Sequence, residues 1–190
     1  MITKATEQFF WTSVNPVPVQ YPWLTENLDC EIAIIGGGVT AALCALRFSE
    51  AGYDTVLLSA SPIGFGGTAA SSGMMSIDGE QCIATLVDKI GADRAMMAVE
   101  LMIQAINNIE QLCNSFNVDC GYKRMDSLRF AEDVKYGEML RREYAMRMHN
   151  GINAQLLTNL NAVEYFTFPM EAGVYSEGVG AQIDPYRFVH

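Results

Sequence analysis

The chain has 190 residues, of which 50% are hydrophobic and 18% are charged, so it can bury a core and is not intrinsically disordered. Its 22 acidic residues against 12 basic ones give a formal net charge of -10, which leaves no basic field to attract a nucleic acid or an anionic lipid surface. We therefore expect a globular protein of one domain or slightly more, with no nucleic acid as a partner.

The N-terminal sequence and the cysteines indicate the cellular compartment in which the protein is expected. Residues 1–20 lack an apolar stretch followed by a small-residue cleavage site, so we expect no signal peptide. The five cysteines are widely spaced and form no C-x-x-C pair, which argues against a disulfide framework and a zinc site. We expect no bound metal, a reducing cytoplasm, and buried thiols at Cys44 and Cys113. The uncharged stretch 55–77 is rich in glycine and serine, so we expect loops there rather than a membrane span.

The first elements along the chain predict a βαβ unit. Residues 1–29 are rich in aromatic residues and proline and are expected to form an extended arm that covers apolar surface. The run 31–35 is typical of a buried parallel strand, the apolar spacing over 39–51 predicts a helix, and 55–58 predicts a second strand.

The rest of the chain continues the alternation of strands and helices. After a Gly/Ser-rich loop over 61–79, we expect helices at about 80–90, 92–116 and 133–149, and strands at 127–131, 154–157 and 173–176. Near the end, Asp184 and Pro185 have the form of an N-cap followed by proline at the first helical position. This order predicts an α/β fold.

Three glycines follow the first predicted strand. A G-x-G-x-x-A motif is formed by Gly36, Gly37, Gly38, Val39, Thr40 and Ala41. Gly36 permits the tight turn, Gly38 lets backbone approach a pyrophosphate, and Ala41 lets the helix pack closely on the strand. The free N–H groups and the positive dipole end of the helix attract the anion, so the motif predicts a dinucleotide site.

The residue at the end of the second strand bears on the ribose contact. Dinucleotide-binding units place an acidic residue there, about 20 residues after the glycines, whereas this chain has Ser59. A neutral hydrogen bond contributes about 0.5–1.5 kcal/mol and one to a charged group about 1.5–3, so we expect a weaker contact. NADP is disfavoured because no Lys or Arg lies between Arg47 and Lys89. A second interpretation, in which Ser59 begins a turn, stays open.

A second glycine loop follows this strand. Residues 64–73 read GFGGTAASSG. Their backbone N–H groups and the hydroxyls of Thr68, Ser71 and Ser72 are suited to hold phosphate or flavin without any cation. A simple NAD-binding unit does not require such a loop, so its presence favours a larger cofactor.

These segments together resemble a known family. The resemblance is carried by YPWLTENLDCEIAIIGGGVTAALCALRFSEAGYDTVLL, IGFGGTAASSGMM and YSEGVGAQIDPYRFVH. They are similar to the N-terminal half of FAD-dependent oxidoreductases of the D-amino-acid oxidase and glycine oxidase type, over about residues 21–190. The second loop also matches a G-x-G-x-T-x-A-S pattern of bacterial members.

The resemblance implies a Rossmann-like FAD/NAD(P)-binding fold with FAD as the cofactor. It places Gly36, Gly38 and Ala41 at the ADP pyrophosphate, Ser59 at the ribose, and Gly66, Gly67, Thr68, Ser72 and Gly73 along the phosphates towards the flavin. The expected cofactor-binding set also includes Gly37, Val39, Thr40 and Met74, of which Met74 follows the second loop closely enough to touch the flavin ring. The implied reaction is oxidation of an amine or amino acid by hydride transfer to the flavin, with catalytic residues expected mainly beyond His190.

The resemblance also predicts a division of the chain. We expect an N-terminal arm at 1–29, an FAD-binding part at 30–120, the start of an α+β substrate domain at 121–180, and a truncated return segment at 181–190. Family members are about twice as long, so we expect the N-terminal part of an enzyme with an incomplete fold. The alternative is a non-catalytic nucleotide-binding or interaction module that uses NAD, ADP or no ligand, which Ser59 and Ala70 favour.

Overall fold

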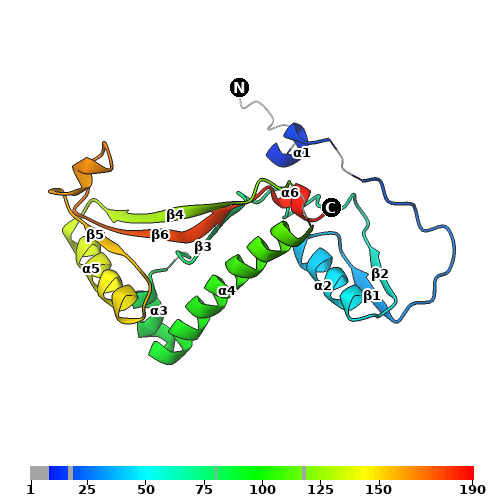
Figure 1. The fold of residues 1–190 in the computed structure, drawn as a ribbon, viewed down its shortest axis with the longest axis horizontal. Helices are drawn as coiled ribbons and strands as arrows, with labels where there is room; N and C mark the ends of the chain where they lie inside the picture. The colour runs from blue at the N-terminus through cyan, green and yellow to red at the C-terminus, as the bar shows by residue number, and fades with distance from the viewer. Residues whose placement is uncertain (1–8, 17–18, 80, 117–118) are drawn as a thin grey trace, which may run out of the picture. The chain divides into compact units, whose positions relative to one another are not determined.

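The computed structural model describes residues 9–16, 19–79, 81–116 and 119–190, which form two compact units (Figure 1). The first unit comprises Met1–Gly73, Asn117–Gly121 and Ile183–His190. The second comprises Met74–Phe116 and Tyr122–Gln182. Each unit therefore combines segments that lie far apart in the sequence.

The first unit contains the predicted strand–helix–strand segment. Its elements are β1 (Ile32–Ile35), α2 (Val39–Glu50) and β2 (Thr55–Leu58). The two strands pair in parallel, with Ile32 opposite Thr55, and α2 packs against both. The predicted βαβ unit is confirmed, and its boundaries agree with the sequence prediction to within one residue.

The expected burial of this segment is wrong. In the described part of the chain its sheet has two strands, so one edge of β1 has no strand beside it. The residues of β1 alternate between half-buried and exposed, and Ile35 is 79% exposed. No residue of α2 is fully buried, and Cys44 on this helix is exposed, whereas Cys113 in the second unit is buried as expected.

Two short helices complete the first unit. Helix α1 (Phe10–Val14) lies within the expected arm 1–29, whose residues 1–8 and 17–18 lie outside the described residues. Helix α6 (Pro185–Phe188) begins as the sequence predicts, because Asp184 Oδ1 accepts hydrogen bonds from the backbone N–H groups of Tyr186 and Arg187, each at 3.0 Å.

The second unit is built on an antiparallel sheet. Its strands are β3 (Met74–Ser76), β4 (Lys123–Ala131), β5 (Gln155–Leu157) and β6 (Ala172–Gln182), and β6 pairs with the other three. Strand β3 lies inside the predicted loop 61–79, and β4 and β6 are longer than predicted. The sequence predicts shorter strands because glycines and charged residues interrupt the apolar alternation of β4 and β6. The pairing of β4 with β6 extends both strands beyond the residues that the local pattern indicates.

Three helices lie on one face of this sheet in Figure 1. They are α3 (Ile83–Ile90), α4 (Ala92–Phe116) and α5 (Val134–His149), and a single 3-10 turn, η1 (Ala162–Glu164), follows β5. The apolar stripe predicted along 92–116 is buried at Ala95, Val99, Ile106 and Cys113. The expected start of the first of these helices, Glu80, lies outside the described residues. Helix α4 contacts α3 and the sheet strands, so it belongs to the second unit although the sequence analysis assigned it to the part 30–120.

A cluster of buried charges joins the helices of the second unit to its sheet. Arg147 of α5 is fully buried; its Nε donates to Glu143 Oε1 at 3.0 Å and its Nη1 donates to Ser176 Oγ of β6 at 3.1 Å. Its Nη2 pairs with Asp78. Glu143 Oε2 in turn accepts the backbone N–H of Ala84 at 2.9 Å, near the start of α3. One guanidinium therefore fixes α5 against the sheet and, through Glu143, against α3.

We predict that Arg147→Met lowers the free energy of unfolding by about 3–5 kcal/mol, because it leaves Glu143 as a buried carboxylate without its cation and leaves Asp78 with only its longer ion pair to Arg129, at 3.5 Å. The matched control is Arg142→Met on the same helix, whose ion pair with Asp88 is exposed and is therefore expected to contribute little. Urea unfolding of the two variants checks the difference. Equal unfolding midpoints would show that the buried cluster contributes no more to stability than the exposed ion pair.

The second glycine loop ends where two backbone segments meet. Gly73 has φ +73°, and a Cβ atom built on it would lie 2.2 Å from the carbonyl oxygen of Ile183. The N–H of Ile183 donates to the carbonyl of Gly73 at 2.9 Å. The position therefore requires glycine for its backbone conformation and for the close approach of the Ile183 segment.

We predict that Gly73→Ala destabilises the protein by more than about 2 kcal/mol, because a left-handed backbone alone costs a side chain about 1–2 kcal/mol and the Ile183 backbone must also move. In the same loop, Gly67 has no atom within 4 Å of its added Cβ, so Gly67→Ala is expected to change stability by less than about 1 kcal/mol. Thermal or urea unfolding without ligand measures both. A Gly73→Ala protein as stable as Gly67→Ala would refute the close approach.

Candidate functional site

The first glycine motif connects β1 to α2 by a tight turn. Gly36 has φ +125°, a conformation that favours glycine, and its N–H donates to the carbonyl of Leu58 at the end of β2 at 2.7 Å. Gly38 is the extended N-cap of α2 and has no side chain of its own to cap the helix. The predicted strand–glycine–helix context of this motif is therefore present.

The start of α2 presents backbone donors. The first N–H groups of a helix have no carbonyl to pair with inside the helix, which leaves those of Val39, Thr40 and Ala41 for other acceptors. The N–H of Val39 donates to Thr68 Oγ1 at 3.1 Å. The N–H groups of Thr40 and Ala41 are the donors that this helix start can offer to an anion, with the helix dipole behind them.

Two of the glycines let the second loop come close to the first. A Cβ atom on Gly37 would lie 2.7 Å from Ser59 Oγ, and one on Gly38 would lie 3.2 Å from Thr68 Oγ1. The carbonyl of Gly37 also accepts the N–H of Gly64 at 2.7 Å. Gly38 is predicted to allow the approach of a pyrophosphate, and in the structure it also has a close neighbour from the protein itself, Thr68.

The second loop folds into successive turns around Thr68. The N–H of Ala70 donates to the carbonyl of Gly66 at 3.0 Å, and that of Ser71 donates to the carbonyl of Thr68 at 3.2 Å. Thr68 is only 8% exposed, whereas Gly66 and Gly67 are exposed. A Cβ on Gly36, Gly66 or Gly67 would meet nothing within 4 Å, so open space adjoins the backbone of both loops at these glycines.

Helix α6 supports the second loop from within the same unit. A Cβ on Gly64 would lie 2.7 Å from the ring of Tyr186, and Phe65 contacts that ring edge to face at a centroid distance of 5.9 Å. Burial raises the pKa of Tyr186, with a smaller contribution from the charge of Asp184. Burial lowers the pKa of His190, which lies edge-on to Tyr186, although the carbonyl of Ile63 acts in the opposite direction. This support could not be predicted from the sequence, because nothing near Gly64 points to residues more than a hundred positions later.

Ser59 lies directly after β2, where the sequence analysis expects the ribose contact. Its hydroxyl donates to the carbonyl of Ser61 at 2.7 Å, so the side chain takes part in a local turn. This geometry agrees with the interpretation of Ser59 as a turn residue, and its role at a ribose stays a prediction.

The remaining predicted residues follow the loop towards the second unit. Ser72 is exposed, and Gly73 is buried beside Ile183. Met74 is the first residue of β3 and is 72% exposed, but it belongs to the second unit. The structure thus brings together 36–41 with Gly66, Gly67 and Thr68, while contact of Met74 with a cofactor stays a prediction.

The chemistry of these donors fits the diphosphate of FAD. Backbone N–H groups, a helix start and hydroxyls bind anionic oxygens without a cation, and open space adjoins the backbone at Gly36, Gly66 and Gly67. The residues that would hold the group are Thr40 and Ala41 through their N–H groups, together with Gly66, Gly67 and Thr68 of the second loop, which the bond from Val39 to Thr68 joins to the helix start. Because no Lys or Arg lies between Arg47 and Lys89, backbone and hydroxyl dipoles supply all the electrostatic attraction that this segment can exert on a diphosphate.

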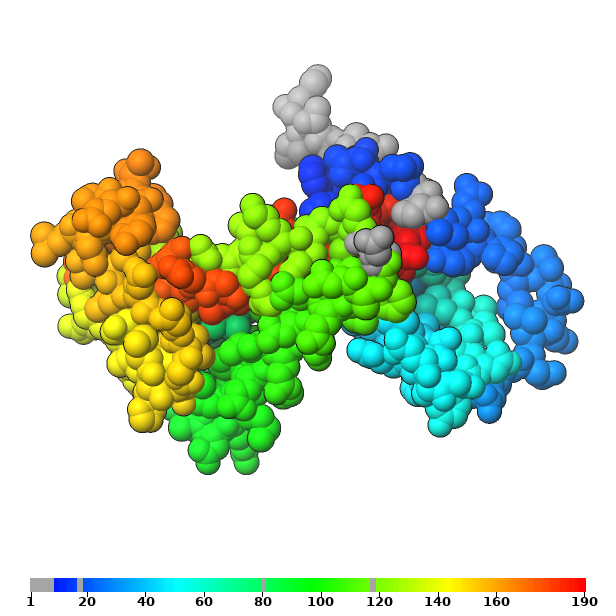
Figure 2. Space-filling view, in the orientation of Figure 1, coloured from blue at the N-terminus to red at the C-terminus, as the bar shows by residue number. Residues whose placement is uncertain are grey.

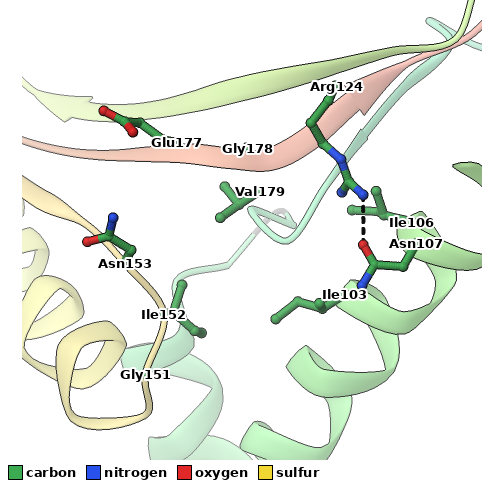
Figure 3. Close-up of a pocket in the computed structure, with 10 residues that line it drawn as sticks. All are labelled: Ile103, Ile106, Asn107, Arg124, Gly151, Ile152, Asn153, Glu177, Gly178 and Val179. Carbon is green, nitrogen blue, oxygen red and sulfur yellow. Dashed lines mark hydrogen bonds between the residues drawn. The ribbon is translucent and has the colours of Figure 1, made fainter.

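A separate cleft of about 420 Å³ lies inside the second unit (Figure 3). Its apolar lining includes Ile106 and Val179, and Arg124 reaches into it from β4. The guanidinium of Arg124 donates to Asn107 Oδ1 at 2.7 Å and pairs with Glu110. None of the predicted cofactor residues lines this cleft, and its cation is already paired with residues of α4.

The described residues contain neither a metal site nor a membrane-spanning helix. No cluster of three or more His, Cys, Asp or Glu side chains there has a geometry suited to a metal ion. In the same part of the chain, no helix has the length and apolar character needed to cross a membrane.

Comparison with known proteins identifies relatives over most of the chain. Residues 31–190 match the model of the DAO family, described as FAD dependent oxidoreductase. Gamma-glutamylputrescine oxidoreductase from Escherichia coli (strain K12) is 30% identical over 122 residues, which is 64% of this chain and 28% of that protein. The chain spans between 24% and 31% of the length of the curated relatives it matches.

Solved structures share the fold. Glycine oxidase from Geobacillus kaustophilus matches 84% of this chain and 42% of its own, with a TM-score of 0.64 and 19% identity. L-alpha-glycerophosphate oxidase from Mycoplasma pneumoniae, solved with FAD bound, matches 84% of this chain and 40% of its own, with a TM-score of 0.61 and 19% identity.

The predicted fold class, a Rossmann-like α/β fold that is incomplete, is confirmed by these matches. The comparisons give no support to a non-catalytic NAD or ADP module. With two ordered glycine loops at a helix start and a family match over residues 31–190, the chain belongs to the FAD dependent oxidoreductase family.

Proposed function

We propose that this chain forms the dinucleotide-binding part of an enzyme that oxidises an amine or an amino acid with FAD. The observation that carries the proposal is the hydrogen bond from the Val39 N–H to Thr68 Oγ1, which joins the two glycine loops at the start of α2. The family match and the amine and amino-acid oxidoreductases among the relatives support the same reaction class.

The chain's own residues bind and orient the cofactor. The N–H groups of Thr40 and Ala41 hold the pyrophosphate at the positive end of α2. Gly66, Gly67 and Thr68 of the second loop would contact the same group, and Ser72 and Met74 are the residues that we propose would contact the cofactor further along its length. Ser59, already bonded to Ser61, contributes at most a neutral hydrogen bond to the ribose.

When bound, FAD supplies the acceptor for the hydride that leaves the carbon bearing the amine, and the imine product hydrolyses. The protein needs few reactive side chains for such chemistry, and we place none of them in this chain. We propose the cytoplasm as the location, which the wide spacing of the cysteines in the sequence and the absence of a C-x-x-C pair support.

The direct test is the visible spectrum of the purified full-length protein, followed by chromatography of the cofactor released on denaturation. We expect flavin absorbance and release of FAD, or recovery of both when FAD is added to cofactor-free protein. A colourless protein that gains thermal stability from NAD, but not from FAD, would contradict the proposal.

We predict that Thr68→Val weakens FAD binding by about threefold to tenfold, because it removes the acceptor of the Val39 N–H while keeping the shape of the side chain. The control is Thr85→Val, whose hydroxyl contacts Met139 in the second unit and is expected to leave FAD affinity unchanged. Equilibrium dialysis or flavin fluorescence titration measures both dissociation constants. An unchanged constant for Thr68→Val would remove the proposed role of the link between the loops.

A further inference from the structure

Helix α1 lies beside α6 in the first unit (Figure 2). Two polar side chains hold it there. Trp11 Nε1 donates to the carbonyl oxygen of Ser71 in the second glycine loop at 2.8 Å. Asn15 Nδ2 donates to Asp184 Oδ2, directly before α6, at 2.5 Å. The two contacts join α1 to segments 60 and 169 residues further along the chain.

These contacts belong to a closed path of hydrogen bonds. Ser71 Oγ accepts the N–H of Gly73 at 3.1 Å, and the carbonyl of Gly73 accepts the N–H of Ile183 at 2.9 Å. Ile183 precedes Asp184, whose side chain accepts from Asn15 of α1. The path returns to its start because Asn15 and Trp11 lie on the same turn of helix, where Asn15 Nδ2 also donates to the Trp11 carbonyl at 2.9 Å. The end of the loop therefore cannot move away from α6 without breaking a bond in this path.

Burial of apolar surface does not explain the docking of α1. No residue of the helix is fully buried, and its apolar side chains Phe10 and Val14 are 66% and 57% exposed. The indole of Trp11 is the exception, since it approaches Gly73 so closely that an added Cβ there would lie 2.9 Å from the ring. The contacts that fix α1 are thus directed polar bonds and one ring at the loop end, rather than the apolar cover expected of an N-terminal arm.

We propose that α1 is a strap that holds the end of the second glycine loop in place, and that Trp11 and Asn15 are positioning residues for the cofactor cradle. A loop already ordered before binding loses less conformational entropy when the ligand arrives, so the strap raises affinity without touching the ligand. The link to FAD rests on the proposed function, whereas the restraint on the loop does not depend on it.

The test uses hydrogen exchange in the cofactor-free full-length protein. Trp11→Phe keeps the aromatic ring and removes the donor to Ser71, and Asn15→Ala removes the donor to Asp184. We expect the amides of Gly73 and Ile183 to exchange about threefold to tenfold faster in each variant, as loss of one hydrogen bond implies. The matched control is Trp23→Phe, since Trp23 is 89% exposed in the same N-terminal segment. Exchange as slow as in the unchanged protein would overturn the proposal that α1 restrains the end of the loop.

A second readout separates positioning from general stability. Trp11→Phe is expected to raise the dissociation constant of FAD by about the same factor while the midpoint of global urea unfolding stays that of Trp23→Phe. Faster exchange with an unchanged dissociation constant would overturn the positioning role. If the unchanged protein fails to bind FAD, the proposed function fails, and the exchange rates still decide whether the strap exists.

Discussion

The hydrogen bond between the amide of Val39 and the hydroxyl of Thr68 is the contact on which the candidate site depends. Glycine at position 38 leaves room for it, because an added Cβ there would lie 3.2 Å from the same hydroxyl and would require Thr68 to shift. The bond also needs α2 to begin at Val39, so that this amide has no acceptor in its own helix. Two loops whose bonded residues are 29 positions apart are thereby fixed against each other, and the remaining amides of the helix start are left for a ligand.

Because the chain is acidic, the candidate site must attract a diphosphate through backbone dipoles rather than through positively charged side chains. A protein with a net charge of -10 and no Lys or Arg between Arg47 and Lys89 does not attract a diphosphate through side-chain charge in that segment. Backbone dipoles depend on the exact placement of the peptide groups, since their field falls off within the first turn of the helix. Affinity in such a site therefore comes from order in the two loops, which gives a reason for the supports at Gly64, from α6, and at Gly73, from Ile183 and α1.

A feature could be predicted from the sequence when the residues that determine it are close together along the chain. The βαβ unit and the cap at Asp184 were predictable because an apolar run, a glycine turn and an N-cap are written in neighbouring residues. Strand β3 was not, because its three residues owe their conformation to pairing with β6, more than a hundred positions later. Glu143 and Arg147 stand four residues apart on a charged helix, a spacing typical of exposed ion pairs, but tertiary packing buries both. The contact of Trp11 with Ser71 has no local signature at all.

A crystal structure of the full-length protein with FAD tests the central claim most directly. The account predicts phosphate oxygens within hydrogen-bonding distance of the backbone N–H groups of Thr40 and Ala41, with Val39 still bonded to Thr68. A diphosphate bound elsewhere, or a second loop that leaves Val39 when FAD enters, would contradict it.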